Sequence, residues 1–71
     1  MVSEIYLRVN PAQIDLLTKL IEGYDNLGIV STLNRADGVV IIRGTSDTYP
    51  ELNEIIKHLP FEHTRLSKKV L

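Results

Sequence analysis

The sequence predicts a small α+β protein, a two-layer sandwich in which two helices cover one face of a four-stranded antiparallel sheet. Three observations predict this class. Apolar and polar side chains alternate in several short segments, which is the period of a half-buried strand. Two other segments carry apolar residues at helical spacing. These segments follow one another as strand, helix, strand, strand, helix, strand within 71 residues, the length of a single domain spanning residues 1–71.

The first strand is expected over residues 4–9, where apolar and polar side chains alternate. Asn10 and Pro11 then end the strand and begin a helix over about residues 11–25. Asn10 is expected to form a capping box with Gln13, with Pro11 at the first helical position. The apolar stripe of this helix consists of Ile14, Leu17, Leu20, Ile21 and Tyr24.

Two strands joined by a hairpin follow, over residues 28–34 and 39–43, with Gly44 ending the second. The loop over residues 34–38 ends in Asp37-Gly38, two residue types that tolerate positive φ. The second of these strands opens with four consecutive apolar residues, Val39-Val40-Ile41-Ile42. It is therefore apolar toward both faces of the sheet, unlike a strand with one solvated face.

The second helix is expected to begin near Thr48, which precedes Glu51 at capping-box spacing, and to end before Pro60. Residues 61–66 are expected to form a fourth strand at an edge of the sheet. Residues 67–71 are expected to fray, which leaves an ordered core over about residues 3–66.

This order of elements, with short connections and right-handed crossovers, has one common solution, the ferredoxin-like βαββαβ sandwich with strands ordered 4-1-3-2. The first and third strands are then antiparallel neighbours at the centre. A plausible register sets Glu4 opposite Arg43, Tyr6 opposite Ile41 and Arg8 opposite Val39.

The sheet face without helices is expected to carry an apolar patch, and such a patch is rarely left to water on a small monomer. We therefore expect the chain to self-associate through this open face as a homodimer or higher homo-oligomer. The alternative is that the patch is ordinary exposed apolar surface. The expected interface residues are Tyr6, Arg8, Ile29, Leu33, Val39, Ile41 and Arg43.

A small-ligand or anion site is the alternative functional hypothesis. The Asn10-Pro11 turn and the hairpin over residues 34–38 are expected at the same end of the sheet, with Asn10, Gln13 and Asp37 as candidate ligand residues. A second candidate, the loop over residues 44–48, is explained by turn and cap chemistry alone.

The sequence offers little support for catalysis, metals or other cofactors. It contains no cysteine, which excludes thiolate zinc sites and thiol catalysis. His58 and His63 flank Pro60, so no helical spacing pairs them as ligands, and we expect neither a metal site nor an enzyme. Eight basic and nine acidic residues do not favour nucleic-acid binding. The longest apolar run is far too short for a membrane span, and we expect a cytoplasmic protein.

The stretch from Ile5 to Gly44 resembles a small bacterial family of single-domain proteins of unknown function, especially in its segment Leu20 to Thr32, Leu-Ile-Glu-Gly-Tyr-Asp-Asn-Leu-Gly-Ile-Val-Ser-Thr. In order of elements the chain is also similar to ACT domains, a likeness that implies an effector-sensing role at an interface between copies. Asn10-Pro11 replaces the glycine that ACT domains carry after the first strand. The chain is similar in order to acylphosphatases too, but it lacks their glycine-rich anion loop.

Overall fold

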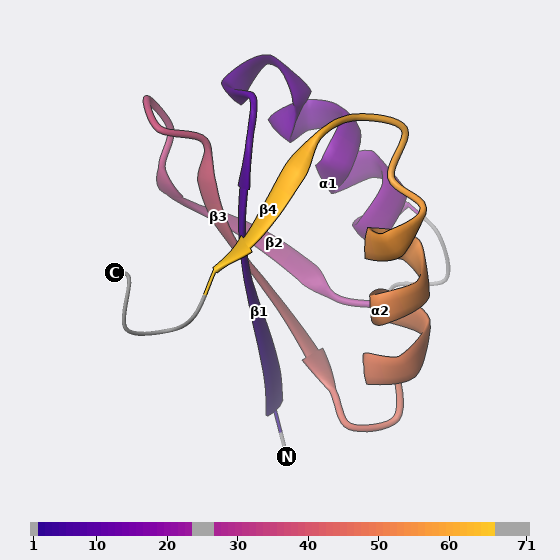
Figure 1. The fold of residues 1–71 in the computed structure, drawn as a ribbon. Coiled ribbons are helices and arrows are strands. Elements are labelled where there is room, and N and C mark those ends of the chain that lie inside the picture. Colours follow the sequence, from indigo (N-terminus) through magenta and orange to yellow (C-terminus); the bar gives the residue numbers. More distant parts are fainter. Residues whose placement is uncertain (1, 24–26, 67–71) are drawn as a thin grey trace.

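A computed structural model describes residues 2–23 and 27–66, which form one four-stranded sheet and two α-helices (Figure 1). In chain order the elements are β1 (Val2–Val9), the short 3₁₀ helix η1 (Pro11–Gln13), α1 (Ile14–Glu22), β2 (Ile29–Asn34), β3 (Val39–Thr45), α2 (Tyr49–Lys57) and β4 (His63–Leu66).

The strands lie in the order β2-β3-β1-β4, and every neighbouring pair is antiparallel. Counted from β4, this is the predicted order 4-1-3-2. The central register is also confirmed, since Glu4 pairs with Arg43, Tyr6 with Ile41 and Arg8 with Val39. Both helices lie on the same side of the sheet (Figure 1).

The hydrophobic core lies between the sheet and the two helices. Alternate residues of β1 and β3 point toward the helices, as expected for strands with a period of two. Each helix presents one apolar stripe to them. The buried members of this cluster are Ile5, Leu7, Val9, Ile14, Leu17, Ile21, Leu27, Val40, Ile42, Leu52 and Ile56.

Both predicted capping boxes are wrong. The Asn10 side chain accepts from the backbone N–H of Ala12 at 2.9 Å, because a 3₁₀ turn tightens the helix start. The amide of Gln13 instead donates to the backbone oxygen of Asn10. Thr48 makes no side-chain cap, because its hydroxyl accepts from the backbone N–H of Thr45 at 3.0 Å.

Several element ends differ from the prediction. β1 begins two residues earlier, at Val2, and β4 begins at His63 rather than residue 61. β3 continues through Gly44 to Thr45. A Cβ at Gly44 would lie 2.6 Å from the Leu52 side chain, so the glycine lets α2 approach the strand closely.

α1 ends at Glu22, with Gly23 as its C-cap. The predicted end of this helix, including Tyr24, lies outside the described residues.

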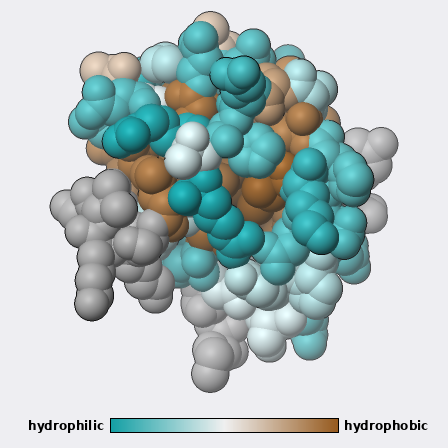
Figure 2. All heavy atoms as spheres, in the orientation of Figure 1, coloured by the Kyte–Doolittle hydropathy of each residue, from teal (hydrophilic) through white to brown (hydrophobic). Residues whose placement is uncertain are grey.

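Figure 2 shows the side of the molecule that carries β4 and α2, where hydrophilic residues cover much of the surface. Among the described residues, no helix is long and apolar enough to cross a membrane.

Candidate functional site

The open face of the sheet differs from the predicted interface at its centre. Val39 and Ile41 are only 3% and 1% exposed within a single chain, so the expectation that they form an exposed patch is wrong. Ile29 and Leu33 are exposed, at 64% and 46%, and both belong to β2. Self-association itself stays a prediction.

The position of β3 explains this burial. β3 has a neighbour on each side, so Ile41 lies between Tyr6 of β1 and Ser31 of β2, and Val39 lies beside Arg8. Tyr6 and Arg8 are the direct cross-strand partners of Ile41 and Val39, and side chains of directly opposite residues stand on the same face of a sheet. Glu4 and Arg43, which the predicted register sets opposite each other, are in contact, with Arg43 Nε at 3.4 Å from Glu4 Oε2.

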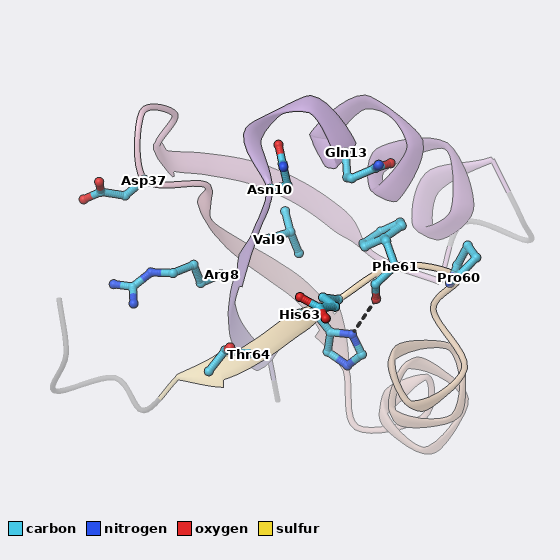
Figure 3. Close-up of a pocket in the computed structure, with 10 residues that line it drawn as sticks. Arg8, Val9, Asn10, Gln13, Asp37, Pro60, Phe61, His63 and Thr64 are labelled. Atoms are coloured by element: carbon cyan, nitrogen blue, oxygen red, sulfur yellow. Dashed lines mark hydrogen bonds between the residues drawn. The ribbon is translucent and has the colours of Figure 1, made fainter.

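The structure brings the three residues of the alternative site hypothesis together, and ligand binding there stays a prediction. Asn10, Gln13 and Asp37 all line one open hollow of about 880 Å³, a volume within the usual range of small-molecule sites, about 300–1,000 Å³. The hollow lies where β1 ends, the hairpin turns and β4 begins (Figure 3). Its lining residues are Arg8, Val9, Asn10, Gln13, Asp37, Pro60, Phe61, Glu62, His63 and Thr64.

The hairpin tip is held against the end of β1 by the backbone. The Val9 N–H donates to the Gly38 carbonyl oxygen at 2.9 Å. Gly38 has a positive φ of 72°, and a Cβ there would clash with the Val9 oxygen. The predicted role of Asp37-Gly38 in the hairpin is thus confirmed at Gly38.

Asp37 is oriented by its neighbour across the turn. Its backbone N–H donates to Asn34 Oδ1 at 3.1 Å, and Asn34 Nδ2 donates to Asp37 Oδ2 at 3.2 Å. These two bonds fix the carboxylate on the hairpin without neutralising its charge.

Polar groups with unused hydrogen-bonding capacity face the hollow. Among residues 2–23 and 27–66, the side chains of Arg8, Gln13 and Glu62 make no hydrogen bond or ion pair, although each lines the hollow. In Figure 3, Arg8 and Asp37 extend toward one side, whereas Gln13 and Phe61 lie on the other. Arg8 and Asp37 therefore place opposite charges on one side of the hollow, Gln13 and Phe61 place an amide and an aromatic ring on the other, and the Glu62 carboxylate is a further charge in the lining.

The antiparallel pairing of β4 with β1 brings in the residues that sequence reasoning missed. Val9 pairs with His63 and Arg8 with Thr64. The His63 ring nitrogen Nδ1 lies 3.2 Å from the Phe61 oxygen, which fixes the ring (Figure 3). The predicted strand order could have found them, because a fourth strand beside the first places His63 and Thr64 next to the Asn10 turn.

The histidines are separated in the structure, as their spacing around Pro60 predicts. His58 caps α2 and lies 3.6 Å from Glu54, whereas His63 lines the hollow. Within the described part of the chain, no three His, Cys, Asp or Glu side chains cluster as metal ligands do. The chemistry that the hollow offers is ionic and amide hydrogen bonding.

A model of the family described as "Domain of unknown function (DUF4911)" matches residues 7–62. The match covers most of the chain and both sides of the hollow. The resemblance to a small family of unknown function is therefore confirmed. Neither the curated proteins nor the solved structures contain a match to this chain.

Proposed function

The chain belongs to this family of unknown function, and we propose from the geometry of the hollow that the domain binds a small molecule carrying both an anionic and a cationic group. Arg8 would receive the anionic group, and Asp37 the cationic group. The amides of Asn10 and Gln13 would supply further hydrogen bonds. Phe61 would contact the apolar part of the ligand.

One observation carries this proposal. Arg8 and Asp37 carry opposite charges and line the same hollow, yet no ion pair joins them. Each charge is thus available to a ligand. Arginine is well suited to a carboxylate, because its planar guanidinium donates two parallel hydrogen bonds.

A likeness in the order of elements supports a sensing role. The order of helices and strands is similar to that of ACT domains, which bind small effectors. In this chain the Asn10-Pro11 turn stands where those domains carry a glycine. The proposal therefore assigns recognition to side chains of the turn and hairpin.

The direct test is a thermal-shift screen with amino acids, other zwitterions and simple oxyanions, followed by calorimetric titration of any compound that stabilises the protein. A ligand that uses both charges should stabilise the wild type more than an anion or a cation alone. Arg8→Gln and Asp37→Asn should each weaken its binding about tenfold or more, since hydrogen bonds to charged groups contribute about 1.5–3 kcal/mol.

Arg35→Gln is the matched control, because Arg35 also lies in the hairpin but does not line the hollow. Its exposed pair with Asp15, at 3.9 Å, contributes little. Binding that weakens equally in Arg35→Gln would indicate attraction by net charge and would contradict the proposal. Absence of stabilisation by every compound in the screen would also contradict it.

A further inference from the structure

β2 lies at an edge of the sheet, and the strand register shows which of its backbone N–H and C=O groups face away from β3. Val9 and Gly38 form a hydrogen-bonded pair, because the Val9 N–H donates to the Gly38 oxygen. Such hydrogen-bonded pairs recur at every second residue along the β1–β3 ladder. Val40 and Ile42 therefore bond toward β1, whereas Ile41 bonds toward β2. Since Ser31 pairs with Ile41, the backbone groups of Ser31 face inward, and those of its neighbours face outward.

A side-chain contact supports this assignment independently. The Val30 N–H donates to Glu22 Oε2 of α1 at 2.8 Å, so it cannot be directed at β3. By the same alternation the Thr32 N–H and both carbonyl oxygens, of Val30 and Thr32, point away from the sheet. Glu22 therefore occupies one outward donor and leaves the other three groups for a partner.

The side chains of β2 lack the usual protection of an edge strand. The strand Ile29–Asn34 carries no charged residue and no proline, although edge strands commonly use these residues to prevent pairing. Among the described residues, three large hydrophobic side chains are exposed, and two of them, Ile29 and Leu33, lie on this strand. The bulge falls at Leu33, which has no partner on β3, so the regular ladder of this strand runs from Ile29 to Thr32.

We propose that β2 pairs antiparallel with β2 of a second copy of this chain, around a twofold axis at Ser31. Only registers centred on a residue keep the two sheet faces aligned. A centre at Val30 would set Ile29 opposite Ser31, and a centre at Thr32 would set Ser31 opposite Leu33. The centre at Ser31 alone directs Ile29 of each copy toward the bulged Leu33 of the other, so that these two exposed side chains would shield each other from water.

Glu22 limits the strength of this association. In the proposed register, the Thr32 N–H of each copy donates to the Val30 oxygen of the other. The Val30 N–H would donate to the Thr32 oxygen of the other copy, where the carboxylate of Glu22 now lies. Glu22 must therefore leave this position for the complete ladder to form.

Sedimentation equilibrium over a range of concentrations measures the association. The wild type should dimerise reversibly, and Ile29→Lys should weaken the dimer at least about tenfold, because a lysine opposes edge pairing. Glu22→Ala should tighten the dimer roughly tenfold by releasing two amides. Leu16→Lys is the control, because Leu16 is also an exposed apolar residue, with 40% of its surface accessible, but lies on α1.

Two further variants test the register and guard against a folding artefact. Thr32→Pro removes the outward N–H and keeps the ladder to β3, so it should fold, as judged by circular dichroism, and remain monomeric. Ser31→Cys should form a disulfide-linked dimer on mild oxidation, because opposed residues of this type lie about 4.5 Å apart at Cα. The chain has no other cysteine, and Ser46→Cys in an exposed loop should not cross-link efficiently.

A wild type that remains monomeric at high micromolar concentration would overturn the proposal. A dimer that persists in folded Thr32→Pro, or that cross-links equally through Ser46→Cys, would overturn it as well.

Discussion

At one edge of the sheet, β4 is four residues long and is tied to a helix by a charged side chain. At the other edge, β2 is six residues long and uncharged. Arg65 of β4 donates to Asn53 Oδ1 at 2.7 Å and to the Tyr49 hydroxyl at 2.8 Å, both on α2. At β2 a single carboxylate, that of Glu22, accepts one outward N–H.

The difference shows that the two edges of this small sheet are protected by different contacts. On the β4 side, Arg65 ties the strand to Asn53 and Tyr49 of α2, and hydrophilic residues cover much of the surface in that view (Figure 2). On the β2 side, α1 packs beside the strand and Glu22 binds one N–H, but among the described residues Ile29 and Leu33 stay exposed. A chain of this size buries a smaller fraction of its surface than a larger domain, so any further burial contributes a large share of its stability.

The largest effect is expected from removing the anchor of α2. Leu52 is fully buried and connects this helix to the core. Leu52→Ala should lower the free energy of unfolding by about 4 kcal/mol, because it removes buried methyl groups and leaves a cavity. Urea denaturation measures this loss. Leu16→Ala, at an exposed position of α1, should cost less than about 1 kcal/mol, and similar losses for both variants would show that α2 is not anchored in this way.

Paired proline substitutions on β2 test which backbone groups face outward. Ser31→Pro removes an N–H that bonds to β3, whereas Thr32→Pro removes one that points to solvent. We expect Ser31→Pro to be less stable than Thr32→Pro by about 3 kcal/mol, measured by urea denaturation at a concentration where the chain is monomeric. The reverse ranking would show that the alternation assigned to β2 is shifted by one residue.

The smallest effect concerns the closed edge and is a change in titration. The pKa of Tyr49 is lowered by its hydrogen bonds to Asn53 and Arg65 and by the positive charge of Arg65. Arg65→Gln should therefore shift the ultraviolet titration of this tyrosine to higher pH. The same titration of Tyr49→Phe shows which part of the absorbance change belongs to Tyr49. Because the folded pKa is the lowered one, the contribution of this group to stability is complete above its unfolded pKa and is lost as the pH falls through its folded pKa. An unchanged titration in Arg65→Gln would contradict the contact.

The sequence was sufficient for the strand order and the central register, because these depend on a period of two and on short connections. Glu4 and Arg43 could be paired for that reason. The ends of the helices were less predictable, because Asn10 and Thr48 each have several backbone amides within reach. The local choice among these amides depends on how the preceding turn is packed.

The burial of Ile41 and the contact of Glu22 with Val30 could not be derived from local patterns. Both depend on which residues three-dimensional packing places alongside them, across strands in one case and from helix to edge in the other. Asp37 and Asn10 could be assigned to one end of the molecule, since topology alone brings the turn and hairpin together. His63 required the exact start of β4, which the alternation of four residues does not specify.

The bond from Val9 to Gly38 has a consequence for any ligand in the hollow. This contact joins the hairpin to β1 and, through the adjacent residues, determines the separation between a guanidinium and a carboxylate. A side chain at position 38 would push the two segments apart and thereby change the span that a bound molecule must bridge. Under the proposed function, the length of a ligand that bridges Arg8 and Asp37 would therefore depend on this strand pairing.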